Sequence, residues 1–320
     1  MQKLTLIVAT LFFAVSSAFA VQKAVVIVPV ADLRSDQSLP EPGKSDDKQQ
    51  TQLLFGETVE VVKSSGDWVY VNAIEQPSFK YRQRWEGYPG WILKSALRFN
   101  SNTLFDGLIT TKWVTVRSTV NSETISLLPL GSRIRILPVQ ENPYPGVWIN
   151  LLQGQTGWIP FGSFKPIPRS CPSDCRARIL ETATLLLGDT YVWGGLSPSD
   201  ETHKIRLTGV DCSGLTHLSY RVNGVTIPRD SMEQYMKAEK IQRKDLKPAD
   251  LIFSSKADNP QKITHVALYA GGDQIIEAPQ TGMMVRKVSF KEKYGADMAS
   301  VESGTKVGDR VIYFGRLLKN

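Results

Sequence analysis

The first half of the chain contains the same sequence unit twice. Residues 53–62 resemble residues 128–137, residues 66–71 resemble residues 146–151, and residues 87–92 resemble residues 154–159. In both copies, short runs of alternating residues are separated by glycines, prolines and polar clusters, a pattern typical of small all-β barrels. Two copies of one unit predict two similar barrels, at residues 21–100 and 101–168.

The first barrel is expected to have a long polar loop near its start. We expect strands at residues 24–29, 58–62, 68–72 and 90–93, and a loop over residues 31–50. Each copy closes with the pattern Gly-x-x-Gly-Trp-Ile, which resembles the last turn and strand of bacterial SH3-like domains. Trp91 and Trp158 in this pattern are expected to be core residues of their barrels rather than platforms for a ligand.

The two copies differ at two positions where a ligand could bind. Glu57 and Tyr88 of the first copy correspond to Ser132 and Gln155 of the second. A carboxylate and a phenol in only one copy suggest that only the first barrel contacts a ligand. Ordinary divergence of two surfaces would leave the same difference, so both explanations stay open.

Residues 1–20 have the features of a secretory signal peptide. Lys3 supplies a positive start, residues 4–15 are apolar, and Ala18-Phe19-Ala20 forms a small-x-small cleavage site. The apolar run is too short to span a bilayer, and no cysteine follows the cleavage site as a lipid anchor would require. We therefore expect an exported protein, periplasmic or extracellular, without a membrane anchor.

Composition places the chain among ordinary globular proteins. Of its 320 residues, 42% are hydrophobic and 22% are charged, and the formal net charge of +7 is spread along the chain. This surplus fits either weak attraction to an anionic wall polymer or a merely solvated surface. No nucleic-acid motif is present, and we expect a monomer without cofactor or metal.

The chain has three cysteines. Cys171 and Cys175 could form a disulfide, because a spacing of four residues can bring their Cα atoms within range. Cys212 would then be the free thiol. A zinc site is not expected, because no second Cys/His pair lies at ligand spacing.

Residues 169–320 change to a pattern of helices first and strands afterwards. Helices are expected at residues 177–187, from Cys212 to residue 222, and from Asp230 or Ser231 to Met236, and strands at residues 251–254, 265–270, 274–278 and 310–316. This order predicts an α+β domain in which helices pack on an antiparallel sheet.

Cys212 lies at an expected helix start, between Asp211 and Ser213, two residue types that cap helices. The positive end of the helix dipole should lower the pKa of the thiol and favour the thiolate, which is the competent nucleophile. A small buried cysteine at a helix start would be inert instead, and these residues alone do not decide between the two.

A cysteine nucleophile needs a base, and the chain has three histidines. His265 begins an expected strand, and a hairpin at Gly271-Gly272 would bring it near Glu277, twelve residues later. The even spacing puts both side chains on one face of the sheet, where the carboxylate can orient the imidazole. His217 is expected to be a surface or hydrogen-bonded helix residue, and His203 a solvated loop residue.

Five segments of this domain resemble, in the same order, the NlpC-type cell-wall cysteine peptidases. They are Tyr191-Val-Trp-Gly-Gly195, Asp211-Cys-Ser-Gly-Leu215, Ile227-Pro-Arg-Asp-Ser231, Leu246-Lys-Pro-Ala-Asp-Leu251 and His265-Val-Ala-Leu-Tyr269. The resemblance covers residues 175–318 and implies a papain-like fold and cleavage of peptidoglycan stem peptides. With two barrels in front, the chain is similar to the γ-D-glutamyl-L-diamino acid endopeptidases of this family.

The resemblance implies roles for four catalytic residues. Cys212 would be the nucleophile and His265 the base, while Tyr191 and the Cys212 backbone N–H would stabilise the oxyanion. The third position is commonly histidine in this family and is Glu277 here. A carboxylate can still orient the base, so we expect activity with a possible change in the pH profile.

The resemblance also implies a set of substrate-binding residues. Glu57, Tyr88 and Asp211 would bind the free amine of the stem's terminal L-Ala, and Ser213, Asp230 and Ser231 would line the D-glutamyl pocket. An ammonium in a closed site needs acidic or phenolic partners. Ala249 replaces a usual glycine, which affects one local turn.

Two other functions fit parts of the sequence. One is an amidase of the same fold that acts on a different amide, and the other is a wall-binding protein with an inactive catalytic domain. Cys212, His265 and an orienting residue together argue against the second, because a binding protein needs none of them. The sequence does not specify the diamino acid at the cleaved bond.

Overall fold

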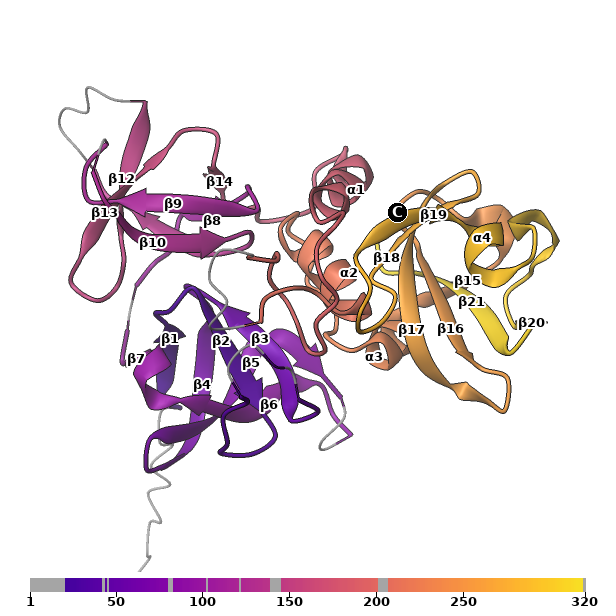
Figure 1. The fold of residues 1–320 in the computed structure, drawn as a ribbon, viewed down its shortest axis with the longest axis horizontal. Helices are drawn as coiled ribbons and strands as arrows, with labels where there is room; N and C mark the ends of the chain where they lie inside the picture. Colours follow the sequence, from indigo (N-terminus) through magenta and orange to yellow (C-terminus); the bar gives the residue numbers. More distant parts are fainter. Residues whose placement is uncertain are drawn as a thin grey trace, which may run out of the picture.

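The computed structural model describes residues 21–41, 44, 46–79, 83–101, 103–120, 122–138, 145–200 and 207–318. The expected signal peptide and His203 lie outside the described residues. The chain forms two small β domains followed by a larger domain of helices and sheet, which agrees with the predicted fold class (Figure 1). No helix in the described part of the chain is long and apolar enough to cross a membrane.

The two N-terminal domains have the same topology. The strands of the first are β1 (Lys23–Val26), β2 (Val30–Arg34), β3 (Gln49–Leu54), β4 (Thr58–Ser65), β5 (Trp68–Ser78), β6 (Glu86–Leu93) and β7 (Leu97–Phe99). Those of the second are β8 (Gly107–Ile109), β9 (Trp113–Arg117), β10 (Thr124–Pro129), β11 (Arg133–Ile136), β12 (Gly146–Asn150), β13 (Thr156–Pro160) and β14 (Phe164–Pro166). Their strand orders, β3-β2-β6-β5-β4-β1-β7 and β10-β9-β13-β12-β11-β8-β14, match position by position. This match fits the expected pair of SH3-like barrels.

Two expectations about the barrels were wrong. The stretch expected as a loop over residues 31–50 contains most of β2 and the start of β3. Arg34, at the end of β2, is buried, and its guanidinium pairs with Asp46 at 2.5 Å. A buried arginine interrupts the alternation of apolar and polar residues from which a strand is predicted. Trp158 is buried as expected, but Trp91 is only half-buried and packs edge-on against Tyr70.

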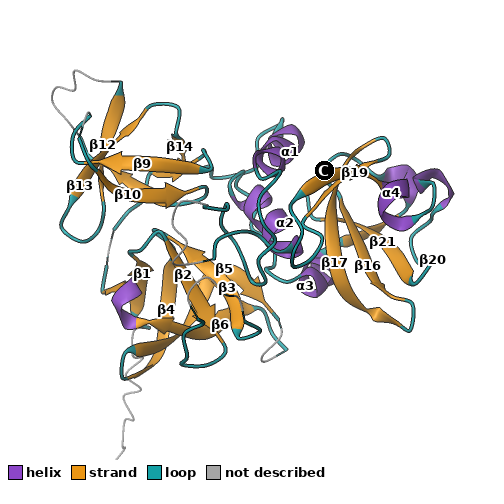
Figure 2. Ribbon diagram, viewed as in Figure 1, coloured by secondary structure: helices purple, strands orange, loops and turns teal. Residues whose placement is uncertain are grey.

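The C-terminal domain has its helices before its sheet. The helices are α1 (Cys175–Leu185), α2 (Cys212–Arg221), α3 (Ser231–Lys237) and the short α4 (Phe290–Tyr294). The strands are β15 (Glu239–Ile241), β16 (Leu251–Lys256), β17 (Asn259–Gly271), β18 (Gln274–Glu277), β19 (Arg286–Ser289), β20 (Thr305–Val307) and β21 (Arg310–Arg316). They form an antiparallel sheet in the order β15-β21-β16-β17-β18-β19, with β20 on β21 (Figure 2).

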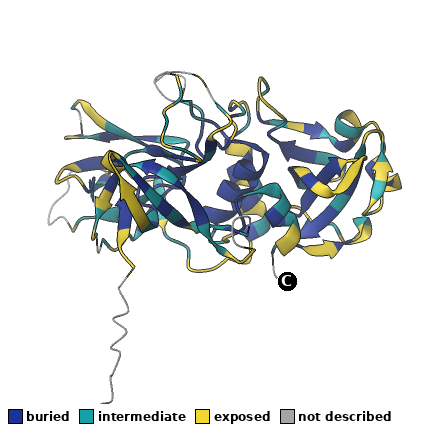
Figure 3. Ribbon diagram, turned by 90° about the horizontal axis from the view of Figure 1, so that it is seen from below, coloured by how far each residue is buried: buried dark blue, intermediate teal, exposed yellow. Residues whose placement is uncertain are grey.

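Helix α2 lies where the three domains meet, and all ten of its residues are buried. The apolar core around it also contains Val30 and Leu54 from the first barrel and Leu108 and Leu130 from the second. Figure 3 shows the resulting concentration of buried segments in the middle of the molecule. The helix that begins at Cys212 is therefore packed by all three domains.

Candidate active site

Cys212 is the first residue of α2 and the free thiol of the chain, since Cys171 and Cys175 form a disulfide with Cα atoms 5.5 Å apart. As predicted, Asp211 caps the helix, and its carboxylate accepts a hydrogen bond from the Gly214 N–H at 2.6 Å. The Cys212 side chain is 8% exposed. The nucleophile candidate thus sits at a well-formed but almost closed helix N-terminus.

The expected lowering of the Cys212 pKa is wrong for the free protein. Burial raises the pKa of the thiol to about 12, and the nearby Asp211 carboxylate adds to the increase. The backbone N–H groups of Val266 and Ser213 and the charge of Arg229 act in the opposite direction but do not outweigh burial. Val266 follows His265 on β17, so the thiol lies against the strand that carries His265. Burial of Cys212 in the free protein thus opposes ionisation of the thiol.

The structure brings His265 and Glu277 together as the spacing predicted. Strands β17 and β18 form a hairpin, and His265 Nε2 lies 2.7 Å from Glu277 Oε2. Because a carboxylate accepts this hydrogen bond, the proton is on Nε2 and the lone pair is on Nδ1. Burial lowers the pKa of His265 despite the opposing effect of Glu277. The imidazole is therefore a neutral base with Nδ1 available for a proton.

Glu277 is fully buried and has two further cationic partners that the sequence did not indicate. Arg286 donates to Oε1 from Nε at 3.0 Å and from Nη2 at 2.8 Å, and Lys293 Nζ lies 2.9 Å from Oε2. Burial favours the neutral acid, but the contacts with His265 and Lys293 outweigh it and lower the pKa of Glu277 to about 2. Arg286 is the direct cross-strand neighbour of Glu277 on β19, a strand that we did not predict.

Tyr191 lies in the turn segment before α2, where its backbone N–H donates to Met283 at 2.9 Å. Burial raises the pKa of its phenol, and the nearby Asp211 carboxylate adds to the increase. The phenol therefore remains protonated and can donate a hydrogen bond to an oxyanion near Cys212.

Asp211 is occupied by a buried arginine rather than open to an amine. Arg229, from the segment before α3, is fully buried and donates to both Asp211 oxygens at 2.9 Å, and the Gly194 N–H donates at 2.9 Å as well. Ser213 Oγ donates to Asp211 at 3.2 Å and accepts from Arg229 at 3.1 Å. Asp211 and Arg229 thus fix the start of α2.

Glu57 is also placed differently from the expectation. It is fully buried, forms an ion pair with Arg221 at the end of α2, and accepts from the Leu54 N–H at 3.0 Å and from Gln76 at 3.1 Å. These contacts make it a link between the first barrel and α2, not an open ligand for an amine.

Tyr88 and Asp230 do meet across the boundary between the first barrel and the C-terminal domain. The Tyr88 hydroxyl donates to Asp230 Oδ2 at 3.0 Å. Tyr88 is buried, whereas Asp230 and the next residue, Ser231, are half-buried at the start of α3. Asp230 therefore remains reachable from outside.

His217 does not belong to this group. It is fully buried inside α2, so it is not a surface residue, and its Nδ1 lies 3.4 Å from the Pro228 carbonyl oxygen. Burial lowers the pKa of His217 to about 3. His217 is therefore neutral at ordinary pH and contributes to the packing of α2.

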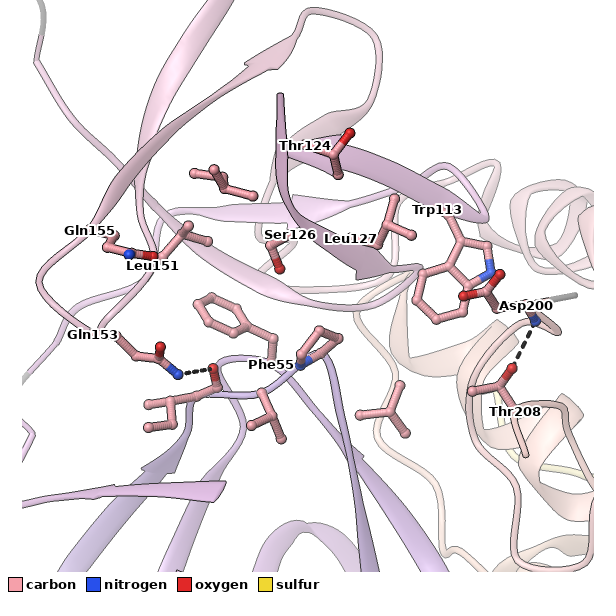
Figure 4. Close-up of a pocket in the computed structure, with 15 residues that line it drawn as sticks. Phe55, Trp113, Thr124, Ser126, Leu127, Leu151, Gln153, Gln155, Asp200 and Thr208 are labelled. Carbon is pink, nitrogen blue, oxygen red and sulfur yellow. Dashed lines mark hydrogen bonds between the residues drawn. The ribbon is translucent and has the colours of Figure 1, made fainter. Parts of the chain in front are cut away.

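A cavity of about 530 Å³ lies apart from these residues, between the two barrels and the segment near Asp200 and Thr208 (Figure 4). Phe55 of the first barrel and Trp113 and Gln155 of the second line it. None of the predicted catalytic or substrate-binding residues contributes to it. The described residues also contain no group of three or more His, Cys, Asp or Glu side chains that could hold a metal ion.

The site can be compared with known proteins. Residues 188–302 match the NlpC/P60 family. The chain is 31% identical over 239 residues to a gamma-D-glutamyl-L-lysine dipeptidyl-peptidase of Bacillus cereus, covering 73% of this chain and 68% of that protein. It is 30% identical over 255 residues to the protein of the same name from Bacillus subtilis, covering 78% of each.

The fold is matched over nearly the whole chain by one solved structure. A crystal structure of an NlpC/P60 family protein from Bacillus cereus superposes with a TM-score of 0.74 and 24% identity, covering 93% of this chain and 100% of that one. The sequence matches and the shared fold point to the same family. The chain belongs to the NlpC/P60 family.

Proposed function

We propose that this protein is a cysteine peptidase that hydrolyses the bond between γ-D-glutamate and an L-diamino acid in peptidoglycan stem peptides. The observation that carries the proposal is the hydrogen bond from His265 to Glu277, with Cys212 at a helix start against the same strand. The names of the two Bacillus relatives support the bond type. We also propose that the protein is exported and acts on wall peptides outside the cytoplasm.

The reaction begins with the neutral pair. His265 Nδ1 takes the thiol proton as Cys212 Sγ attacks the γ-carbonyl carbon of D-glutamate. The developing oxyanion accepts hydrogen bonds from the Tyr191 phenol and the Cys212 backbone N–H. His265 then gives its proton to the amine of the diamino acid as the C–N bond breaks, which leaves a thioester.

The second half of the reaction releases the glutamyl product. His265, neutral again, takes a proton from water as the oxygen attacks the thioester carbon. The C–S bond breaks, and the sulfur recovers the proton from His265. Glu277 orients the imidazole in both halves and accepts its Nε2–H throughout.

Substrate selection is assigned to the junction of the first barrel and α3. Asp230, held by the Tyr88 hydroxyl, binds the free ammonium of the terminal L-Ala, while Ser213 and Ser231 line the D-glutamyl pocket. In this proposal Glu57 and Asp211 support the site from behind, since Arg221 and Arg229 occupy their carboxylates. A free N-terminus would restrict the enzyme to stems already released from glycan.

The test uses the tripeptides L-Ala-γ-D-Glu-meso-diaminopimelate and L-Ala-γ-D-Glu-L-Lys, with products identified by mass spectrometry. Wild type should release L-Ala-γ-D-Glu, Cys212→Ala should release none, and Cys212→Ser should lose most of the activity. N-acetylation removes the positive charge and should lower kcat/KM on the order of a hundredfold or more. Wild-type turnover by the alanine variant would refute the mechanism, and equal rates on free and acetylated peptide would refute the amine site.

A further inference from the structure

Residues 190–196 form a turn, here called the Tyr191 turn, that wraps around the chain just before α2. Tyr191 and Leu196 each form a single β-bridge with Val210, one parallel and one antiparallel. Val210 lies two residues before Cys212. The position of this turn therefore decides where the Tyr191 phenol lies relative to the nucleophile.

One side of the Tyr191 turn is held by the catalytic domain itself. The Gly194 N–H donates to the Asp211 carboxylate at 2.9 Å, and Arg229 Nη2 donates to the Gly195 carbonyl at 3.0 Å. A Cβ on Gly195 would lie 2.3 Å from the Gly209 carbonyl oxygen, so the turn has no room to move closer to that segment. From this side the turn is closely packed.

The other side of the Tyr191 turn is held by strand β3 of the first barrel. Gln49 Nε2 donates to the Trp193 carbonyl at 2.8 Å. Gln52 Oε1 accepts from the Leu196 N–H at 3.1 Å and from the Ser197 hydroxyl at 3.0 Å. Both glutamine side chains are buried, so water does not readily replace these hydrogen bonds. Two side chains of another domain thus hold the middle and the end of the turn.

The backbone of β3 also lies directly against the turn. Gly194 has φ of 69°, and a Cβ there would lie 3.1 Å from Gln49 Cγ and 3.2 Å from the Gln49 carbonyl oxygen. In the second barrel the positions of Gln49 and Gln52 are taken by Thr124 and Leu127 of β10, which line the cavity between the barrels. The two glutamines therefore belong to the copy of the repeat that packs against the site.

We propose that Gln49 and Gln52 are positioning residues for the oxyanion site, which they complete by holding the Tyr191 turn in place from the first barrel. A donor stabilises an oxyanion when it lies about 2.7–3.1 Å from that oxygen, and a misplacement of about 1 Å costs a large part of the rate. The first barrel is then part of the apparatus for the chemical step. The proposal rests on the proposed function in taking Tyr191 as the oxyanion donor for attack by Cys212.

The first test needs no substrate and measures amide hydrogen exchange by mass spectrometry. Gln49→Met keeps the length of the side chain and removes its hydrogen bond, so a peptide covering residues 190–197 should exchange about fivefold to tenfold faster than in wild type. Gln52→Met, which frees the Leu196 N–H, should do the same. The matched control Thr124→Val, at the equivalent position of β10, should leave this exchange unchanged. Wild-type exchange in both glutamine variants would overturn the proposal.

The second test asks whether Gln49 acts through Tyr191. Gln49→Met should lower kcat for the tripeptide about tenfold and change KM by less than about twofold, whereas Thr124→Val should change neither. Tyr191→Phe removes the donor and should lower kcat on the order of a hundredfold. Adding Gln49→Met to Tyr191→Phe should then cost less than about twofold more, because the group that Gln49 positions is already missing.

The outcomes separate this proposal from the proposed function. A tenfold loss that persists in the Tyr191→Phe background, or a loss confined to KM, would contradict positioning of the phenol by Gln49. If wild type cleaves neither tripeptide but exchange at residues 190–197 still rises in Gln49→Met and not in Thr124→Val, the proposed substrate is wrong and the hold of β3 on the turn stands.

Discussion

The two barrels share one strand order but meet the catalytic domain in different ways. In the first barrel, β3 holds the segments that precede Cys212: Gln49 donates to the Trp193 carbonyl at 2.8 Å, and Gln52 accepts from the Leu196 N–H at 3.1 Å. In the second barrel the equivalent strand, β10, borders the open cavity between the barrels with Thr124, Ser126 and Leu127 (Figure 4). The same strand of one repeated unit thus contacts another domain in one copy and a cavity in the other.

The hydrogen bonds of the first barrel continue as a buried chain. Arg229 donates to Thr51 at 2.7 Å, Thr51 donates to Gln76 at 2.7 Å, and Gln76 donates to Glu57, which pairs with Arg221. Both ends of α2 are therefore tied to this barrel, the start through Asp211 and Arg229 and the end through Arg221. The difference between Glu57 and Ser132 in the two copies marks a domain interface, not a ligand site.

The largest loss of stability is expected for Arg221→Met. It leaves the fully buried Glu57 without its cation and removes a partner of Glu75, so we expect a loss of about 3–5 kcal/mol in the free energy of unfolding. Urea denaturation measures it. A control within the second barrel, Arg135→Met, removes an exposed pair with Asp106 and should cost less than about 1 kcal/mol. Equal losses would mean that the buried pair between α2 and the first barrel stabilises the protein no more than an exposed surface pair does.

The next largest loss of stability is expected when Gln52 of the first barrel is replaced by leucine, the residue at the equivalent position 127 of the second barrel. Gln52→Leu removes hydrogen bonds to Leu196, Ser197 and the Leu207 carbonyl, and should destabilise the protein by about 2 kcal/mol. The reverse change, Leu127→Gln, faces the cavity and should cost less than about 1 kcal/mol. Thermal unfolding compares the two. A larger loss from Leu127→Gln would show that β10, and not β3, holds the interface.

A smaller effect, on catalysis, is expected at the other pair of differing positions. Tyr88→Phe removes the hydroxyl that orients Asp230 and should lower kcat/KM for the free tripeptide about tenfold, with little change for the acetylated one. Gln155→Ala, at the matching position beside the cavity, should leave both values unchanged. If Tyr88→Phe lowers kcat/KM equally for the free and the acetylated tripeptide, Tyr88 supports the fold and not the amine site.

The smallest effect is expected for Ser132→Ala. The Ser132 hydroxyl is buried and has no hydrogen-bond partner among the described residues, so its removal should change the free energy of unfolding by less than about 0.5 kcal/mol. Its counterpart Glu57 should be far more sensitive to substitution. A marked loss of stability from Ser132→Ala would place an important contact in the second barrel.

The sequence predicted those features that depend on local pattern. The repeat, the cap at Asp211 and the hairpin that joins His265 to Glu277 follow from spacing within short segments. The functions of Glu57 and Asp211 did not follow, because their partners Arg221 and Arg229 reach them only after the domains have packed. The pKa of Cys212 was misjudged for the same reason: the helix dipole is local, whereas the burial that outweighs it comes from all three domains.

Ala249 stands where the resembling family usually has glycine, and its backbone conformation is one that favours glycine. It lies in a turn with φ of 68°, in the left-handed region where glycine has no steric penalty. Its carbonyl accepts a hydrogen bond from the Tyr220 hydroxyl of α2, so the turn is held in place despite the strain. The positive φ explains why glycine is usual at this position of the family.

The closed environment of the Cys212 thiol also affects how long the enzyme can last. Peroxide and disulfides react with thiolates and hardly with thiols, and burial raises the pKa of Cys212, which disfavours the thiolate. A buried, protonated thiol is therefore protected from these reactions between turnovers. The burial that makes the thiol a poor resting nucleophile therefore makes it durable against oxidation.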